Sequence, residues 1–453
     1  MFALLDTSSV PSELRSYLPL MLESLLELPL ERDGKIISHD EVVAQLNDDT
    51  VNSSTSIGIG SHGMFTCGSF SNSATLVLQV ESSKYEKGLT WLRELLYKTV
   101  FTVERLKVIA MKMNNSVSQV KRCGRSVVAY VMKGLRYSED SNVMKNGILQ
   151  QNKFLTEIIE NLDTEAGGKE ILEKMETLRK IITDPANFVL YLAGNLDYLK
   201  EPVEAINGIL PDGVNALQKQ QRLNVTPDYK LMKQDSPLDG CIVGMGCLES
   251  SFFFQTINSI TDYTDPDLPA LMLYLQYIIQ AEGPMWKQIR GKGYSYNYRM
   301  STKVHEGLLY LIYGKATNVV GAYKETKDII QERLQSRQWD STLLDSARSS
   351  IIFNIIDEEK TIGSVVSLSV ISYFQGVDYQ YNRRFLELTN KVTVEDLNRV
   401  GEKYIAPLFA TNNVKTAVVA DPAKIDEIAS GFKKLDLNLT VYPSLEDSFL
   451  NKA

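Results

Sequence analysis

The sequence predicts an α+β protein with two domains of the same fold, each an antiparallel sheet covered by helices. The first observation is a repeated order of elements, in which a strand, an apolar helix, two strands and two long helices precede a closing strand. The second is a constant offset of 238 residues, which separates Tyr85 from Tyr323 and Thr102 from Asp340. The third is periodicity, because strand-like runs alternate apolar and polar residues whereas helix-like runs are apolar every three to four positions.

The first domain is expected over residues 1–200. It begins with a short apolar strand, and a Thr-Ser-Ser-Val-Pro turn separates this strand from an apolar helix. Alternating strands of this kind bury one face of an antiparallel sheet. The expected elements are a strand at 2–5, a helix at 13–28, strands at 57–65 and 75–80, a helix from Tyr85, a helix capped by Thr102, and a strand from Phe188.

The second domain is expected over residues 241–443, after a linker at 201–240 and before a tail at 444–453. The linker mixes Pro, Gly, Gln, Lys and Asp, as connecting segments do. Asp265 followed by Pro266 is expected to cap the first helix of this domain. The other elements are a strand at 251–260, a helix at 268–281, strands at 293–300 and 308–313, a helix from Tyr323, a helix capped by Asp340, and a strand at 416–421.

Composition excludes several functional classes. The formal net charge is −8 over 453 residues, so the chain has no basic stripe to neutralise phosphates, and we expect no nucleic-acid partner. The short basic cluster Lys121, Arg122 and Arg125 is interpreted as a solvated helix face. No run approaches 18 uninterrupted apolar residues, so no membrane association is expected.

The four cysteines are dispersed, which predicts free, buried thiols and a reducing compartment. We therefore expect a cytoplasmic protein, with the mitochondrial matrix as the alternative. The chain begins inside its first strand, which suggests a fragment, an internal start or a gene model cut from a longer protein. The cysteines are Cys67, Cys123, Cys241 and Cys247.

Hydrolytic centres of the common kinds are not expected in this chain. Its three histidines, His39, His62 and His305, are dispersed, and neither H-x-x-E-H nor H-E-x-x-H occurs. We therefore expect no metal site and no cofactor in this chain. His305-Glu306 is interpreted as a surface turn between strands. Cys123 has basic neighbours that could lower its pKa, but a buried inert thiol is the preferred interpretation.

The segment from Glu282 to Tyr296 is the most informative stretch of the chain. A Gly283-Pro284 break ends an apolar helix, a short amphipathic turn finishes at Arg290, and a Gly-x-Gly releases an aromatic strand. Arg290 and Tyr296 can therefore converge on one point, which is the geometry needed to hold a peptide carbonyl as it becomes an oxyanion. The alternative is an arginine paired with a surface carboxylate and a tyrosine that fills the sheet.

This segment resembles the Arg/Tyr motif in the C-terminal half of pitrilysin-type zinc peptidases, the inverzincins. The tyrosine follows the arginine by six residues, which is similar to presequence protease and its uncharacterised eukaryotic relatives. Members like insulin-degrading enzyme place it after seven. The resemblance extends more weakly to the preceding strand, residues 248–252, and to the domain order of nearly the whole chain.

The resemblance implies a fold like that of pitrilysin and mitochondrial processing peptidase, and a clamshell peptidase of two halves. The other half, in the same polypeptide or in a partner subunit, would hold zinc, so this chain alone would be inactive. Arg290 and Tyr296 would act on the scissile carbonyl, and Gly293 and Tyr294 would bind substrate. Tyr294 and Tyr298 are alternatives to Tyr296.

Extended peptide substrates would add a strand to a sheet edge. Two other functions remain open from the sequence. The chain could be the catalytically silent subunit of a heteromeric peptidase, or a structural scaffold derived from a peptidase. The retained Arg290 and Tyr296 favour the peptidase functions, because a scaffold has no need of them.

Overall fold

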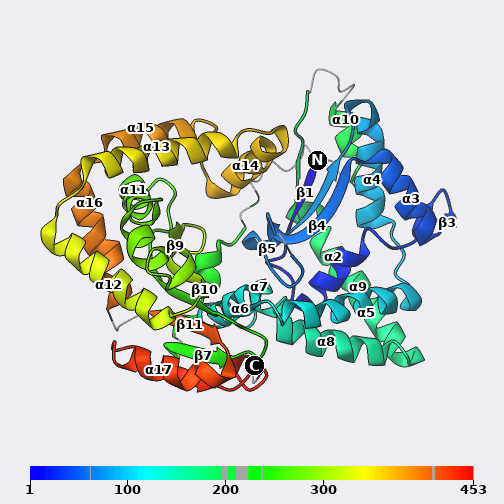
Figure 1. Cartoon of the computed structure of the whole chain (residues 1–453). Helices are drawn as coiled ribbons and strands as arrows, with labels where there is room; N and C mark the ends of the chain where they lie inside the picture. Colours follow the sequence, from blue (N-terminus) through cyan, green and yellow to red (C-terminus); the bar gives the residue numbers. More distant parts are fainter. Residues whose placement is uncertain are drawn as a thin grey trace. The chain divides into compact units, whose positions relative to one another are not determined.

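The computed structural model describes residues 1–61, 63–195, 202–210, 223, 225–235, 238–410 and 414–451. The chain forms two compact units, each with its own sheet and helices (Figure 1). Unit 1 comprises residues 1–118 and 139–227, and unit 2 comprises residues 119–138 and 228–453. This division differs from the expected domain boundaries at residues 119–138, and part of the expected linker at 201–240 lies outside the described residues. The α+β fold class is confirmed.

Unit 1 contains a four-stranded antiparallel sheet in the order β4-β5-β1-β6. β1 is an inner strand of this sheet, and its Ala3, Leu4 and Leu5 are fully buried. The strands are β1 (Phe2–Asp6), β2 (Leu30–Arg32), β3 (Lys35–Ile37), β4 (Asn52–Ile59), β5 (Ser69–Gln79) and β6 (Phe188–Tyr191). The helices are α1 (Ser12–Arg15), α2 (Leu18–Ser24), α3 (His39–Asp49), α4 (Tyr85–Tyr97), α5 (Val103–Val120), α7 (Asn142–Lys145), α8 (Ile148–Asn161), α9 (Glu165–Ile182) and α10 (Pro202–Asn207).

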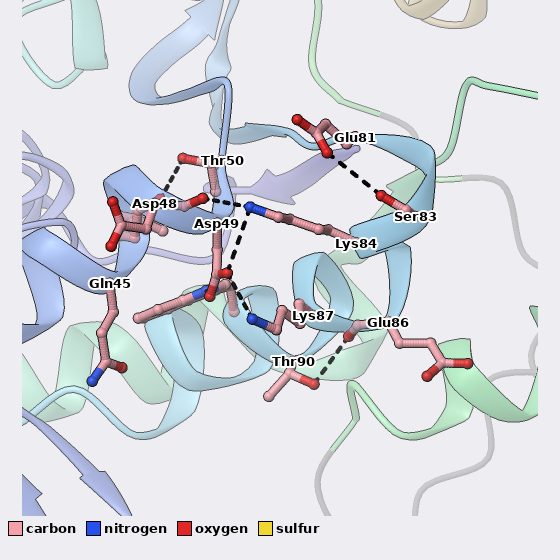
Figure 2. Close-up of polar contacts among 12 residues, drawn as sticks. Gln45, Asp48, Asp49, Thr50, Glu81, Ser83, Lys84, Glu86, Lys87 and Thr90 are labelled. Carbon is pink, nitrogen blue, oxygen red and sulfur yellow. Dashed lines mark hydrogen bonds and ion pairs between the residues drawn. The ribbon is translucent and has the colours of Figure 1, made fainter.

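A polar contact fixes the end of α3 to α4 within unit 1 (Figure 2). The Asp49 carboxylate accepts hydrogen bonds from Lys87 Nζ at 2.8 Å and from Trp91 Nε1 at 3.1 Å. The side chains of Lys84 and Lys87 both point toward Asp49 in Figure 2. The hydrogen bond from Lys87 helps to lower the pKa of Asp49. These contacts satisfy a half-buried carboxylate and hold the two helices together.

Unit 2 contains a six-stranded mixed sheet in the order β12-β7-β11-β8-β10-β9. Its β8, β9, β10 and β11 pair antiparallel, whereas β7 is parallel to both β11 and β12. The strands are β7 (Gly240–Gly244), β8 (Ser251–Asn258), β9 (Ser295–Lys303), β10 (Leu308–Ala316), β11 (Lys415–Ala420) and β12 (Thr440–Tyr442). The helices are α6 (Gly124–Arg136), α11 (Leu268–Ile279), α12 (Val319–Ser336), α13 (Ser341–Glu358), α14 (Ile362–Gln375), α15 (Tyr381–Lys391), α16 (Val394–Val400) and α17 (Ile425–Lys433).

Successive side chains of a strand point to opposite faces of the sheet, and both faces of this sheet are covered. Phe253 and Ile257 of β8 belong to a large apolar core that includes residues of α11, α12 and α16. The neighbouring residues of β8, Phe252 and Thr256, contact α6 on the opposite face. Unit 2 is therefore a three-layer structure in which the sheet lies between α6 and the other helices.

α6 lies close to the sheet because its contact positions are small or apolar. A Cβ atom on Gly124 would come within 2.5 Å of the Phe252 ring, so glycine permits this approach. Val127, Val128 and Val131 of the helix are buried with at most 1% exposure. Burial of this kind contributes about 25 cal/mol for each Å² of apolar surface, which makes α6 part of the unit 2 core.

Arg136 ends α6 with three hydrogen bonds to β8. Its guanidinium donates to Thr256 Oγ1 at 2.8 Å, to the Thr256 carbonyl at 2.6 Å and to Asn258 Oδ1 at 3.2 Å. Burial lowers the pKa of Arg136 to about 10, so the side chain stays charged at neutral pH. A buried charge is stable only when it is hydrogen-bonded, and each of the three nitrogens of this guanidinium donates to an acceptor.

A buried carboxylate lies in the turn between β9 and β10. Glu306 accepts hydrogen bonds from Tyr137 Oη at 3.0 Å and Tyr310 Oη at 2.6 Å, and Lys303 Nζ lies 3.4 Å away. Burial by itself would raise the pKa of Glu306, but the Lys303 charge and the hydrogen bond from Tyr310 lower it to about 2. The prediction that the His305-Glu306 turn lies at the surface is therefore wrong for Glu306, which is only 4% exposed.

Several boundaries differ from those expected. The helix expected at 13–28 is divided into α1 and α2, with Pro19 at the start of α2. Asp267 rather than Asp265 precedes α11, and α12 begins at Val319 with an Asn318 cap rather than at Tyr323. Asp340 caps α13 as expected, by accepting from the Leu343 amide at 3.0 Å.

The cysteines also differ from expectation. Cys241 is buried, Cys67 is half-buried, and Cys123 and Cys247 are exposed, so the expectation of buried thiols is correct only for Cys241. Hydrogen bonds from Ser126 and Arg125 outweigh burial and lower the pKa of Cys123. Among the helices of the described residues, none combines the length and apolarity needed to cross a membrane.

The contact between Tyr137 and Glu306 predicts a stability effect. Tyr137→Phe removes a hydrogen bond to a buried carboxylate, and we expect it to lower the free energy of unfolding of unit 2 by about 1.5–3 kcal/mol. Urea denaturation followed by far-UV circular dichroism measures the change. Tyr97→Phe is the matched control, because Tyr97 Oη donates to a neutral acceptor, the Thr183 carbonyl, at 2.9 Å. Equal losses in both variants would contradict the role of the carboxylate.

The lowered pKa of Glu306 also predicts a pH dependence. Because its pKa is lower in the folded chain, this carboxylate stabilises unit 2 fully above about pH 5, and the contribution is lost as the pH falls toward 2. The loss amounts to roughly 3 kcal/mol. Unfolding measured between pH 6 and 2.5 should therefore show a smaller pH dependence in Glu306→Gln than in the parent. Glu402→Gln, which alters an exposed carboxylate, should keep the parental slope.

Candidate functional site

The site is built on an irregular turn between α11 and β9 in unit 2. After the Gly283-Pro284 break, a single π-helical turn spans Trp286–Arg290. The Gly291 amide donates to the Trp286 carbonyl at 2.9 Å, five residues back. Ile289 is fully buried and holds the turn on the core, which leaves Arg290 at the surface. Such single π turns occur frequently at functional sites.

Arg290 and Tyr296 lie together, as their spacing predicted. The guanidinium carbon of Arg290 is 4.7 Å from the centroid of the Tyr296 ring, which is a cation–π contact. Both side chains are accessible, with Tyr296 61% exposed. Within the described part of the chain no carboxylate forms an ion pair with Arg290. The described residues therefore do not form the surface ion pair that was the alternative interpretation of Arg290.

The other tyrosines of the segment have different surroundings. Tyr298 lies two residues beyond Tyr296 on β9 and packs partly against the core. Burial raises the pKa of Tyr298, and the nearby charge of Arg290 opposes this rise, so Tyr298 also lies near the guanidinium. Tyr294 lies in the turn and packs partly against the core. Its carbonyl accepts from the amides of Thr317 at 3.0 Å and Asn318 at 3.1 Å.

Gly293 and Thr317 fix the turn that connects the pair. Gly293 has a φ of +75°, a left-handed conformation that glycine adopts without strain. Its carbonyl accepts a hydrogen bond from Thr317 Oγ1 at 2.6 Å. Thr317 precedes Asn318, whose side chain caps α12 through the Gly321 amide at 2.8 Å. Thr317 was not identified from the sequence, although the Thr-Asn pair before a helix is a recognisable cap signal.

The residues that the structure describes do not fit a zinc centre. Among them no group of three His, Cys, Asp or Glu side chains converges, and His62 lies outside them. Leu18 and Leu22 of α2 are buried in the unit 1 core. Glu23 of the same helix forms an ion pair with Lys112 at 3.2 Å.

Unit 1 contains a hollow of about 460 Å³. It lies beside the contact of Figure 2 and is lined in part by Arg32, Asp49 and Glu94. Arg32 forms two hydrogen bonds of 2.6 Å to the Glu94 carboxylate, and Asp49 is bonded to Lys87 and Trp91. These charged groups are already paired with one another. We therefore interpret the residues around the hollow as structural contacts and not as a binding site.

Arg290 and Tyr296 together can recognise a carbonyl group. A guanidinium offers several N–H donors and a permanent positive charge, and a phenol offers one O–H donor. Donors placed in advance around one position stabilise negative charge that develops on an oxygen. The pair can therefore supply binding and charge stabilisation to a carbonyl oxygen.

Comparison with known proteins agrees with this assignment of the fold. No protein-family model matches the sequence. An uncharacterised protein of Schizosaccharomyces pombe is 26% identical over 445 residues, which cover 96% of this chain and 43% of that protein. The mitochondrial presequence protease of Saccharomyces cerevisiae is 24% identical over 416 residues, which cover 87% of this chain and 39% of that protein. The chain thus spans about two fifths of the length of these relatives.

Solved structures show the same fold. An inactive domain of a peptidase M16 from Pseudomonas fluorescens superimposes with a TM-score of 0.63 at 15% identity, covering 93% of this chain and 92% of that one. A protease from Helicobacter pylori gives a TM-score of 0.62 at 12% identity, covering 92% of each chain. The chain is therefore a distant homologue of presequence protease with the fold of M16 peptidases.

Proposed function

We propose that this chain is the half of a zinc metalloendopeptidase that does not hold zinc. In this role it supplies substrate binding and transition-state stabilisation to a site completed by a zinc-bearing half. The contact between the exposed side chains of Arg290 and Tyr296 carries the proposal, because no described carboxylate neutralises the guanidinium. The chain is homologous to presequence protease and covers 39% of it, which supports the proposal that another half completes the site.

In the proposed mechanism the substrate carbonyl lies against this pair. Arg290 holds the carbonyl oxygen, and the Tyr296 hydroxyl donates a hydrogen bond as negative charge develops there. Gly293 and the Tyr294 backbone keep the turn in place, with Thr317 as the positioning residue. Zinc in the other half, in the same polypeptide or in a partner subunit, supplies the activation of water. Each donor that acts only in the transition state raises the rate without tightening substrate binding.

A second function is favoured by one specific comparison. The superposition on an inactive M16 domain supports a chain derived from peptidases that serves as a structural scaffold or as a silent subunit. In a scaffold, the Arg290–Tyr296 contact would only hold the turn before β9. The two functions differ in turnover, because a structural contact affects stability but has no effect specific to the transition state.

Replacement of the pair separates these functions. In an enzyme reconstituted with a zinc-bearing half, Arg290→Ala and Tyr296→Phe should each lower kcat about 10²–10³-fold, or about 3–4 kcal/mol of transition-state stabilisation. Zinc content and unfolding should stay at parental values. Arg337→Ala and Tyr379→Phe change exposed residues of unit 2 outside the site and serve as matched controls. Parental turnover in both site variants would favour the scaffold.

The isolated chain gives a second test. We expect it to retain no stoichiometric zinc after dialysis and to cleave no peptide, because no ligand cluster is formed by the described residues. Metal analysis and a fluorogenic peptide assay measure these properties. Near-stoichiometric zinc, or cleavage that persists in the presence of a chelator, would contradict the proposed division of the active site between two halves.

A further inference from the structure

We propose that a second copy of this chain docks on an exposed apolar surface of α13 and α14, so that two copies form a symmetric dimer. This inference goes beyond the proposed function and does not depend on it. Among the described residues, seven of the twelve exposed large apolar side chains lie within residues 353–394. This concentration in a short part of the chain marks an interaction site. Four of the seven form what we call the α13–α14 surface, namely Phe353, Ile356, Ile362 and Val365.

α14 has the composition of a buried helix but is not buried. Its 14 residues, Ile362–Gln375, include no charged side chain, and within the helix as the structure describes it only Val370 is buried. Ile362 is 85% exposed, and Phe353 at the end of α13 is 65% exposed. A helix that is apolar on all sides is normally covered by protein or by lipid. The α13–α14 surface therefore calls for a covering partner.

Local contacts hold this surface in one shape. Three residues, 359–361, separate α13 from α14, and Thr361 Oγ1 caps α14 by accepting a hydrogen bond from the Ser364 amide at 3.1 Å. Asn382 Nδ2 of α15 donates to Glu359 Oε1 at 2.6 Å, which fixes α15 beside this turn. A surface that is already ordered loses less conformational entropy on binding.

Two charged residues beside the surface suit a symmetric contact. Glu358 at the end of α13 and Arg383, which follows Asn382 in α15, are both exposed, and neither has an ion-pair partner among the described residues. Partial burial and the negative charges of Asp357 and Glu359 raise the pKa of Glu358. In a two-fold contact the same surface of each copy meets the other, so Glu358 of each copy can pair with Arg383 of the second.

The size of the surface suits a weak dimer. At roughly 100 Å² for each large side chain, the four apolar residues of two copies would bury roughly 800 Å² between them. Polar contacts at the rim would add to this area, and specific interfaces begin at about 1,200 Å². A lipid surface is a less suitable cover, because acidic residues, Asp357, Glu358 and Glu359, lie beside the apolar ones. Helices that lie on anionic membranes carry basic residues there.

The mass of the full chain in solution tests this proposal. Sedimentation equilibrium at about 0.5–100 µM should show a reversible change from a monomer of 50.9 kDa toward twice that mass, with a Kd in the micromolar range. Because most of the contact is apolar, about 0.5 M salt should raise this Kd no more than about threefold.

Substitutions locate the contact. Ile362→Ser and Phe353→Ser should each raise the Kd at least about tenfold, because symmetry removes the side chain from the interface twice. Ile36→Ser is the matched control, since Ile36 is 62% exposed in unit 1, and it should keep the parental Kd. Circular dichroism should show the parental fold in all three variants, because each replaced side chain is exposed.

Charge reversal tests the symmetric arrangement. Glu358→Arg and Arg383→Glu should each raise the Kd about three- to tenfold, since either change places like charges opposite each other in both symmetry-related pairs. The double variant exchanges the two charges and should recover most of the loss. A double variant that dimerises more weakly than both single variants would contradict this arrangement.

The remaining outcomes separate the possible occupants. A mass of 50.9 kDa at every concentration, or a dimer whose Kd is unchanged in Ile362→Ser and Phe353→Ser, would overturn the proposal. Flotation of a monomeric chain with phosphatidylcholine and phosphatidylserine vesicles, lost in Ile362→Ser, would assign the surface to a membrane instead. A monomeric chain that reconstitutes less well with a zinc-bearing half as Ile362→Ser would assign it to that half. The sedimentation measurements use this chain alone, so their outcome is independent of the turnover measurements on Arg290 and Tyr296.

Discussion

Arg136 makes the contact on which the architecture of unit 2 depends. Its guanidinium gives three hydrogen bonds to Thr256 and Asn258 of β8, and it fixes α6 over one face of the sheet. That face would otherwise expose aromatic residues of β8 and β10, such as Phe254 and Tyr310, whose rings are in contact. The opposite face carries the helices that position the turn before β9. The site thus depends on a sheet whose two faces are both covered.

The hydrogen bonds to Glu306 show how a buried polar group can specify one packing of helix and sheet. A buried carboxylate loses its hydration, so it is stable only where donors replace water. Tyr137 at the end of α6 and Tyr310 on β10 provide these donors from two different elements. A shift of α6 along the sheet would separate them and leave the charge unsatisfied. Apolar contacts alone tolerate such shifts more readily.

Local signals in the sequence predicted much of the fold. The Asp340 cap, the start of α4 at Tyr85 and the alternation of β8 all depend on neighbours within a few residues, and the structure contains each of them. The membership of residues 119–138 in unit 2 was not predicted, because it depends on partners far along the chain. The burial of Glu306 was not predicted for the same reason, since an acidic residue in a turn has no local signal of burial.

The candidate site was predictable for a similar reason. Arg290 and Tyr296 are six residues apart, and two glycines between them restrict where the chain can go. The parts that were missed involve a separate segment. Thr317 holds the Gly293 carbonyl across 24 residues, and this contact follows only once β9 and β10 are paired. Its cap signal was overlooked because the helix was expected to start later, at Tyr323.

The position of α6 in unit 2 also has a consequence for biosynthesis. Arg136 and its partner Thr256 are separated by 120 residues, so α6 leaves the ribosome long before β8 is made. At about 5–20 residues per second the helix waits roughly 6–24 seconds for its sheet. During this time the apolar side of a nascent helix is open to chaperones and to misassembly. The order of translation therefore makes the completion of unit 2 a late and vulnerable step in the life of the chain.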